Sequence, residues 1–275
     1  MSAPTAVADS ELRARIVPPA QRQAAVAPQD LLHSGNAGVV VAKVGQARSE
    51  YRTEARVFAR ELAKHVNTRQ AGNASAFVYE ESFGTEDRLH WLIHLRSLDS
   101  YYSMIEMGDQ DRAYRASLQA ERVPAEPSGG GKGAWDRLFA DGSLHSTVLL
   151  PGDADQPGLV DGAVLHSANA GIVVHRSARS GRGARAEARL SARELVATVN
   201  ARLAGRASAI WYEEAFGATD RLHWLLHLTD LTVYRRLLVE LDEWQNDANR
   251  LFVAATMVDL ALTPHHWGLY GTGEA

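Results

Sequence analysis

The sequence predicts an α+β fold made of two tandem units, each with the element order β-α-β-β-α-β. Three observations support this prediction. The stretch 33–101 recurs without a gap as 166–234. Within each copy, apolar residues recur with the period of a strand and then with the period of a helix. The chain has 275 residues and a hydrophobic content of 45%, enough for two ordinary cores.

The first unit shows its elements in order. A β-branched run bounded by glycine, AGVVVAKV at 37–44, predicts a strand. A helix is expected next, because apolar residues recur at helical spacing at Ala55, Ala59, Leu62 and Val66. The remaining elements are two strands joined by the turn FGTED, a second helix and a closing strand, expected at 75–82, at 88–95, from 98 onward and at 144–151.

The second unit repeats this order and closes with a strand at 254–262. The order is that of the split βαβ, or ferredoxin-like, plan, in which both helices cover one face of an antiparallel sheet. One face of each sheet is then left uncovered. We therefore expect the two sheets to pack face to face as a single-chain, pseudo-dimeric α+β barrel with a chamber between them.

The expected boundaries follow from composition. Residues 1–30 are rich in Ala, Pro and Gln and predict a disordered tail, and the segment PGDADQPGLVDG predicts a linker. The chain is thus divided into a tail, a first repeat with a Gly-rich insertion, a linker, a second repeat and a C-terminal tail, at 1–30, 31–150 (insertion about 119–134), 151–162, 163–264 and 265–275.

Composition also excludes several classes of function. The net charge of −4, without a Lys/Arg-rich block, argues against nucleic-acid binding. No run approaches the ~18 apolar residues of a membrane helix, and no signal peptide is recognisable, so we expect a cytoplasmic protein with no membrane partner. The absence of cysteine excludes disulfides, iron–sulfur clusters and thiolate nucleophiles.

The third strand of each unit separates into two faces. Its apolar face carries Trp91 in the first copy and Trp224 in the second, and it is expected to pack under the helices. The opposite face carries two histidines in each copy, which would gather in the chamber: His90, His94, His223 and His227.

The second strand carries the carboxylates. Glu81 alternates with Glu80, and Glu214 alternates with Glu213, but the sequence does not fix the hairpin register, so either Glu could share the histidine face. A carboxylate beside a neutral imidazole suits general acid–base chemistry. The candidate catalytic residues are His90, His94, His223, His227, Glu81 and Glu214. The alternative is that these histidines are hydrogen-bonded structural groups.

Candidate ligand-binding residues are the tyrosines of the second strand, two loop asparagines and a histidine that replaces Ala42 in the second copy: Tyr79, Tyr212, Asn36, Asn169 and His175. The asparagines could instead order their own loops. We predict no metal site, because His90 and His94 lie about 13 Å apart on a strand at ~3.3 Å per residue, too far to share one ion. The alternative is an ion held by one His from each copy together with a Glu.

The repeat, with DRLHWLIHL and DRLHWLLHL each leading into a Tyr-containing helix, resembles the dimeric α+β barrel superfamily. That group includes antibiotic-biosynthesis monooxygenase-like, EthD-like and NIPSNAP-like proteins and some aromatic polyketide cyclases. The resemblance implies a fused version of the usual homodimer. It also implies a small, often aromatic or polyketide-like substrate held between sheet and helices.

Three hypotheses about function follow. The leading one is a tailoring enzyme of bacterial secondary metabolism, a cyclase or a cofactor-free monooxygenase-like enzyme, monomeric or homodimeric, with His/Glu groups in an inter-sheet chamber. The second is a non-catalytic ligand-binding or scaffold protein, which predicts a filled interior with all histidines paired. The third is a haem or metal protein, since the resemblance extends to chlorite-dismutase-like haem proteins.

Overall fold

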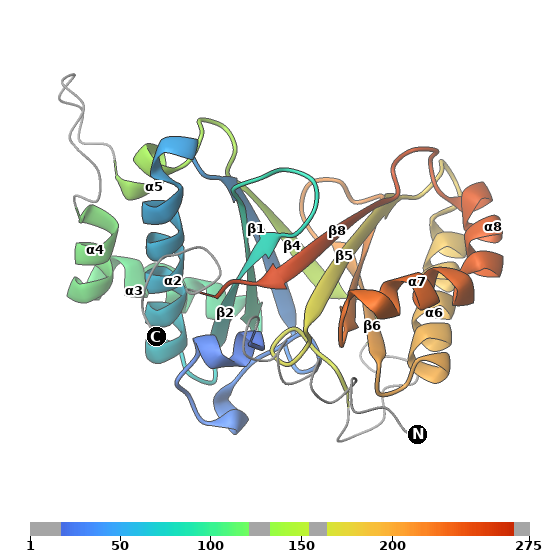
Figure 1. Ribbon diagram of the computed structural model, residues 1–275, viewed down its shortest axis with the longest axis horizontal. Helices are drawn as coiled ribbons and strands as arrows, with labels where there is room; N and C mark the ends of the chain where they lie inside the picture. Colours follow the sequence, from blue (N-terminus) through green and yellow to red (C-terminus); the bar gives the residue numbers. More distant parts are fainter. Residues whose placement is uncertain (1–17, 121–132, 154–163, 267–275) are drawn as a thin grey trace, which may run out of the picture.

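The computed structural model describes residues 18–120, 133–153 and 164–266. It shows a mixed α/β fold in which eight antiparallel strands form a closed barrel, with helices on two opposite sides (Figure 1). The first half contains β1 (Val39–Gln46), α2 (Arg52–Arg69), β2 (Ala74–Glu81), β3 (Arg88–Leu95), α3 (Asp99–Gln110), α4 (Arg112–Gln119), α5 (Ala134–Leu138) and β4 (His145–Pro151).

The second half has the same order of strands. It contains β5 (Ile172–Arg179), α6 (Arg185–Arg202), β6 (Ala207–Glu214), β7 (Arg221–Leu228), α7 (Leu231–Glu240), α8 (Asp242–Leu251) and β8 (Val258–Pro264). Three short 3-10 helices complete the described elements: η1 (Ala20–Gln23), η2 (Pro28–Asp30) and η3 (Ser49–Tyr51).

The strand order around the barrel is β1-β3-β2-β8-β5-β7-β6-β4. Each half contributes four neighbouring strands to this order, β4-β1-β3-β2 from the first and β8-β5-β7-β6 from the second. The halves meet through two short strand pairings, β2 with β8 and β4 with β6. The uncovered faces of the two sheets pack against each other in the barrel interior, as the sequence analysis expects. The sheets also join edge to edge, because these pairings satisfy strand edges that would otherwise stay open.

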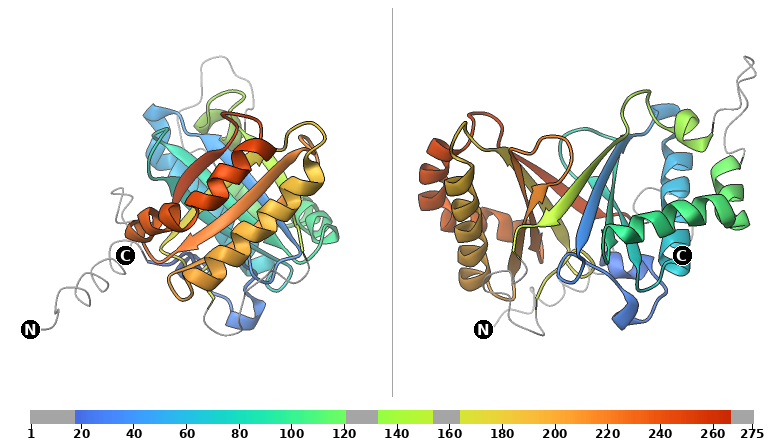
Figure 2. Two further views of the ribbon diagram at one scale, coloured as in Figure 1. Left: turned by 90° about the vertical axis from the view of Figure 1, so that its right-hand side faces the viewer. Right: turned by 180° about the vertical axis from the view of Figure 1, so that it is seen from behind.

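The prediction that the Trp face of the third strand packs under the helices is confirmed. Trp91 lies in one core cluster with Phe58 and Leu62 of α2. Trp224 lies in the equivalent cluster of the second half with Leu195 of α6. Figure 2 shows α6 and α7 lying across the outer face of the second-half strands. The pleat of a strand turns the neighbouring positions, including the histidines, toward the barrel axis.

Each half has more helical structure than the sequence analysis expects. The expected second helix is followed by α4 and α5 in the first half and by α8 in the second. The expected Gly-rich insertion and linker fall mostly outside the described residues. Among the described residues, no helix is both long and apolar enough to cross a membrane.

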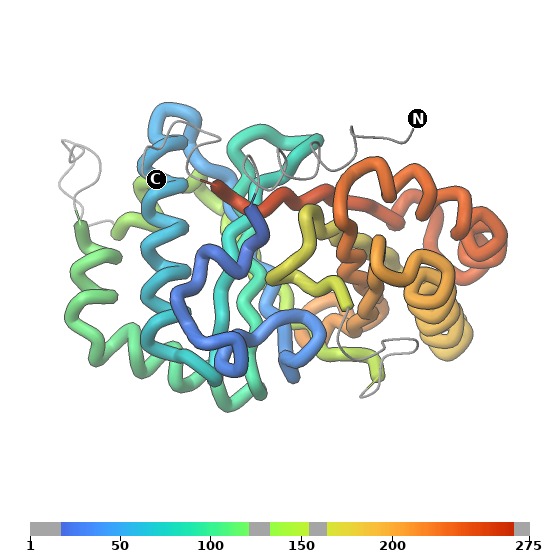
Figure 3. The backbone as a smooth tube through the Cα atoms, turned by 60° about the horizontal axis from the view of Figure 1, so that its bottom comes forward, coloured from blue at the N-terminus to red at the C-terminus, as the bar shows by residue number. Residues whose placement is uncertain are grey.

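Part of the expected N-terminal tail is ordered against the barrel. Ala20 is fully buried, and the Gln23 side chain hydrogen-bonds the backbone of Val78 in both directions. The Gln21 N–H donates to the Ala168 carbonyl, which brings η1 beside the loop that precedes β5 (Figure 3). Residues 18–30 therefore differ from the disordered segment that composition suggests, because one amide side chain replaces strand hydrogen bonds at the β2 edge.

Candidate functional site

The interior of the barrel is packed with side chains from all eight strands. Its apolar part includes Phe77, Leu92, Ile210 and Leu225, which are at most 1% exposed. An eight-stranded barrel is just wide enough for its own side chains. The inter-sheet chamber expected from the sequence is therefore occupied by the protein itself.

Two of the four predicted histidines join the halves near one end of the barrel. His94 Nε2 lies 2.8 Å from Ser167 Oγ, and His227 Nε2 lies 2.9 Å from Ser34 Oγ. Each serine oxygen also accepts the backbone N–H of the other serine at 3.0 Å. Burial lowers the pKa of His94 to about 3. This paired arrangement holds neutral imidazoles in a dry interior.

The loops that carry these serines are held in place by the asparagines singled out above. Asn36 Oδ1 accepts the His33 N–H at 2.7 Å, and Asn169 Oδ1 accepts the His166 N–H at the same distance. The rings of His33 and His166 stack with centroids 3.6 Å apart. Asn36 and Asn169 thus order their own loops, and the structure places them in hydrogen bonds with the backbone.

His90 and Glu81 come together at the other end of the barrel. His90 Nε2 lies 3.3 Å from Glu81 Oε2, and the Thr85 N–H donates to Glu81 Oε1. Gly84 has a φ of 120°, and a Cβ there would collide with the Glu81 carboxylate. A glycine at this position of the hairpin therefore allows Glu81 to lie beside His90. Burial alone would raise the pKa of Glu81, but the hydrogen bonds and the charge of Arg88 hold it below its usual value.

The second half repeats this pair and extends it. His223 Nε2 lies 3.3 Å from Glu214 Oε2, and His223 Nδ1 lies 3.0 Å from His175 Nε2. The three side chains form a continuous chain from a carboxylate to a half-buried imidazole. Burial lowers the pKa of His223 to about 3 and that of His175 well below its usual value.

The hairpin register settles which glutamate shares the histidine face. Tyr79 is the strand partner of His90, so Glu81, two residues later, lies on that face. Glu80 points to the other side, where Arg56 holds it at 2.8 Å. Tyr79 and Tyr212 are fully buried, and their hydroxyls donate to the Ser167 and Ser34 carbonyls. These two tyrosines therefore sit in the packed interior.

A cavity of about 500 Å³ lies on the outer face of the first-half sheet, between that sheet and α2, α3, α4 and α5. Its walls are mainly apolar and include six aromatic side chains: Trp91, Tyr101, Tyr102, Tyr114, Trp135 and Phe216. Phe216 comes from the β6–β7 hairpin, so the second half supplies one wall. A mainly apolar hollow of this size is typical of small-molecule sites.

One charged side chain lines this cavity. Lys43 on β1 places its Nζ 4.0 Å from the centre of the Trp135 ring. Ser146, on the neighbouring strand β4, lies directly opposite Lys43. Burial lowers the pKa of Lys43. Among the described residues, Lys43 forms no ion pair, and its half-buried ammonium lies against an aromatic face.

Lys43 is not among the site residues predicted from the sequence, and Trp91 is expected in the core. A usable signal was present: Lys43 lies on the same strand face as Val39 and Val41, which pack under α2. A charge on a helix-covered face needs a partner or an opening. None of the eleven predicted site residues lines the cavity.

The described residues do not form a site for a metal ion or a histidine-ligated haem. No group of three or more His, Asp or Glu side chains among them is arranged to hold a metal ion. No histidine lines the cavity, and the barrel histidines are engaged with serine, glutamate or each other. These residues do not fit a histidine-ligated haem in the cavity.

Comparison with solved structures shows the same fold in distant proteins. A protein provisionally named a monooxygenase, from Lactobacillus acidophilus, has a TM-score of 0.55 at 8% identity, over 82% of this chain and 92% of that one. An anthrone oxidase-like protein has a TM-score of 0.52 at 8% identity, over 86% and 94%. A haem-binding protein from Thermus thermophilus has a TM-score of 0.51 at 14% identity, over 88% and 97%.

Sequence comparison identifies a family for this chain. No curated protein matches the sequence. The model of a family of unknown function, DUF6039, matches residues 9–156 and again residues 150–251. These two matches cover most of the chain, which therefore belongs to the DUF6039 family.

Proposed function

We propose that this protein is a monooxygenase-like enzyme that acts on a small aromatic molecule in the first-half cavity. The observation that carries the proposal is the cavity itself, about 500 Å³ with aromatic walls. Flat aromatic ligands gain both apolar burial and ring contacts against such walls. Proteins named as a monooxygenase and as anthrone oxidase-like share this fold, which supports the proposal by analogy.

Anthrone is a suitable test substrate, because it supplies the electrons for its own oxygenation. Its methylene group loses a proton to solvent at the cavity mouth, and the enolate reacts with dioxygen. One oxygen atom becomes the new carbonyl of the quinone, and the other leaves as water. The protein would contribute binding, orientation and stabilisation of the enolate in a cavity that is partly closed to water.

The experiment is turnover of anthrone under isotopically labelled dioxygen, with the quinone analysed by mass spectrometry. We expect label in the quinone at a rate well above the uncatalysed reaction. Ala63→Phe should abolish the excess rate, because Ala63 lines the cavity and a phenyl ring would fill it. Leu190→Phe adds a ring at an exposed position of α6 and should leave the rate unchanged. An Ala63→Phe protein with the rate of the wild type would contradict the proposal.

The His/Glu hypothesis is retained as a proposal for the second half. Glu214, His223 and His175 form a hydrogen-bonded chain, of the kind that passes a proton from a buried group to a half-buried one. If the chain acts in turnover, His175→Ala, which restores the residue found at position 42, should change the pH profile of the reaction. A uniform loss of folded protein at every pH would instead indicate a structural role.

A non-catalytic ligand-binding protein is the second candidate. The specific observation in its favour is that the interior is filled and that the predicted histidines His90, His94, His223 and His227 are all hydrogen-bonded. It predicts binding of aromatic compounds in the cavity without labelled product. A role in secondary metabolism, a cyclisation and a cytoplasmic location stay predictions.

We also propose that the chain is a fused duplication in which the halves have diverged in the space under their helices. The family model matches twice, and the two halves have the same strand order and register. On this proposal only one half needs to keep a ligand cavity.

A further inference from the structure

We propose that the first-half cavity binds an aromatic anion, whose carboxylate or phenolate oxygen contacts Lys43. This oxygen takes the place that the carboxylate of Asp259 has in the second half, where it pairs with Arg176. This inference rests on the proposed function and deepens it by naming the charge of the ligand. It follows from a comparison of the same three positions in the two halves.

In the second half these positions form a closed ion pair. Arg176 on β5 donates to both oxygens of Asp259 on β8, each at 2.7 Å. The Tyr234 hydroxyl of α7 donates to the same carboxylate at 2.5 Å. The Arg176 side chain is only 4% exposed, so this carboxylate compensates a charge that is almost completely removed from water.

In the first half the two donors remain and the carboxylate is missing. Lys43 is paired in register with Ser146, as Arg176 is paired with Asp259. Tyr101 stands at the position of Tyr234 in the repeated stretch. Lys43, Ser146 and Tyr101 all line the cavity. The cavity thus contains an ammonium and hydroxyl groups, but no Asp or Glu side chain lines it.

A second donor in the cavity wall also lacks an acceptor. Trp91 is 3% exposed and lines the cavity, and its Nε1 has no hydrogen-bond partner among the described residues. Its equivalent, Trp224, donates to the Ala192 carbonyl at 3.4 Å. The Nε1 atom of Trp91 is shielded from water. The polar groups that a ligand oxygen can meet in the cavity are therefore Lys43 and the hydroxyls of Ser146 and Tyr101.

The chemistry of the ligand follows from these groups. A half-buried ammonium without an ion-pair partner among the described residues, with two hydroxyl groups in the same cavity, calls for an oxygen that carries negative charge. The ring of Trp135, already 4.0 Å below the Lys43 Nζ, offers a flat apolar surface beside that oxygen. The lowered pKa of Lys43 fits a site whose charge is compensated only when the ligand is bound. Aromatic carboxylates, phenolates and enolates combine both requirements.

The test compares a naphthalene carboxylate with the neutral naphthalene carboxamide by calorimetric titration of the full-length protein. We expect the carboxylate to bind at least about tenfold more tightly, the value of one charge-assisted hydrogen bond. Lys43→Met should remove this preference, and Lys43→Arg should keep it. Ser146→Asp should also remove it, since it gives Lys43 the internal partner that Arg176 has in Asp259.

Lys64→Met is the matched control, because Lys64 is exposed on α2 and does not line the cavity. It should leave both affinities unchanged. Thermal unfolding of each variant establishes that it is folded. Equal affinities of the two probes for the wild type, or a preference that survives in Lys43→Met, would overturn the inference and leave the proposed function standing. Failure of both probes to bind the wild type would overturn the proposed function as well.

Discussion

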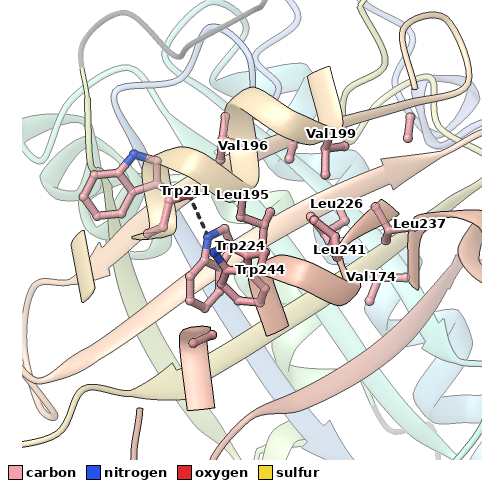
Figure 4. Packing of buried hydrophobic residues seen from close by; sticks show 14 of the residues in the cluster. Val174, Leu195, Val196, Val199, Trp211, Trp224, Leu226, Leu237, Leu241 and Trp244 are labelled. Carbon is pink, nitrogen blue, oxygen red and sulfur yellow. Dashed lines mark hydrogen bonds between the residues drawn. The ribbon is translucent and has the colours of Figure 1, made fainter. Parts of the chain in front are cut away.

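Trp91 and Trp224 occupy the same position on equivalent strands, yet their surroundings differ. Trp224 packs edge to face against Trp244 of α8, with ring centroids 6.1 Å apart, beneath α6 (Figure 4). Trp91 makes a similar contact with Trp135, with ring centroids 5.4 Å apart, but it also faces a cavity. In α7, the buried side chains Val233 and Leu237 seal the second half, whereas Ser100 stands at the position of Val233 in the first.

The difference shows how little separates a packed core from a ligand site. The strands and the long helices α2 and α6 are common to both halves. The halves differ in a few side chains and in the helices that follow α3 and α7. The first half has α4 and α5 at this point, and the second half has the single helix α8. Because the barrel interior is equally filled from both halves, a cavity on one outer face does not require the barrel to open.

The largest expected effect concerns the packed side. Trp244→Ala should lower the free energy of unfolding by about 4 kcal/mol, because it leaves a large hole in a sealed core. Trp135→Ala in the first half should cost clearly less, since Trp135 borders a cavity that already exists. Chemical denaturation of both variants measures the two losses. Equal losses would mean that the halves are packed equally well.

The second prediction makes the second half resemble the first. Asp259→Ser should lower the free energy of unfolding by about 3 kcal/mol, because it strands the buried Arg176 without its partner. The reciprocal change, Ser146→Asp, should cost little or nothing, since Lys43 gains a partner at a position that is exposed. Urea titrations at neutral pH test both changes, and a tolerated Asp259→Ser would disprove the role of the ion pair.

The third prediction concerns pH and the symmetric interior. The pKa of His94 is lowered from 6.5 to about 3 in the folded protein. The unfolded chain therefore binds the proton first as the pH falls, so stability is complete above pH 6.5 and decreases toward pH 3. Each such histidine contributes a slope of up to about 1.4 kcal/mol per pH unit.

Replacing one histidine should flatten this dependence. His94→Gln should reduce the slope of unfolding free energy against pH below pH 6.5. His145→Gln, at an exposed position, serves as the control and should leave the slope unchanged. If the slope of His94→Gln equals that of the wild type, the buried imidazole is not the titrating group.

The smallest expected effect concerns the cavity wall supplied by the other half. Phe216→Ser should weaken binding of an aromatic probe by about threefold, because Phe216 is 65% exposed and contributes only part of its ring. Phe83, on the other hairpin, is similarly exposed at 68% but does not line this cavity. Phe83→Ser should therefore have no effect in the same titration. Equal effects of the two variants would argue against binding at this cavity.

Much of the fold follows from the sequence because it depends on local periodicity. The alternation in RLHWLIHL and RLHWLLHL identifies strands, places Trp91 and Trp224 under the helices and turns the histidines inward, as the structure shows. The match between repeated stretches predicts two units of one strand order. These properties depend on the pleat and on helical spacing, which any short segment carries.

The site depended on contacts that no local pattern contains. The edge pairings of β2 with β8 and β4 with β6 closed the sheets into a barrel too narrow for a chamber, so the histidines became internal hydrogen-bond partners. The hairpin register placed Glu81 beside His90, and only the packing of α3, α4 and α5 left a cavity around Lys43. Sequence determined which faces are apolar, whereas tertiary structure decided which of them are filled, because a cavity is a property of side chains brought together from distant segments.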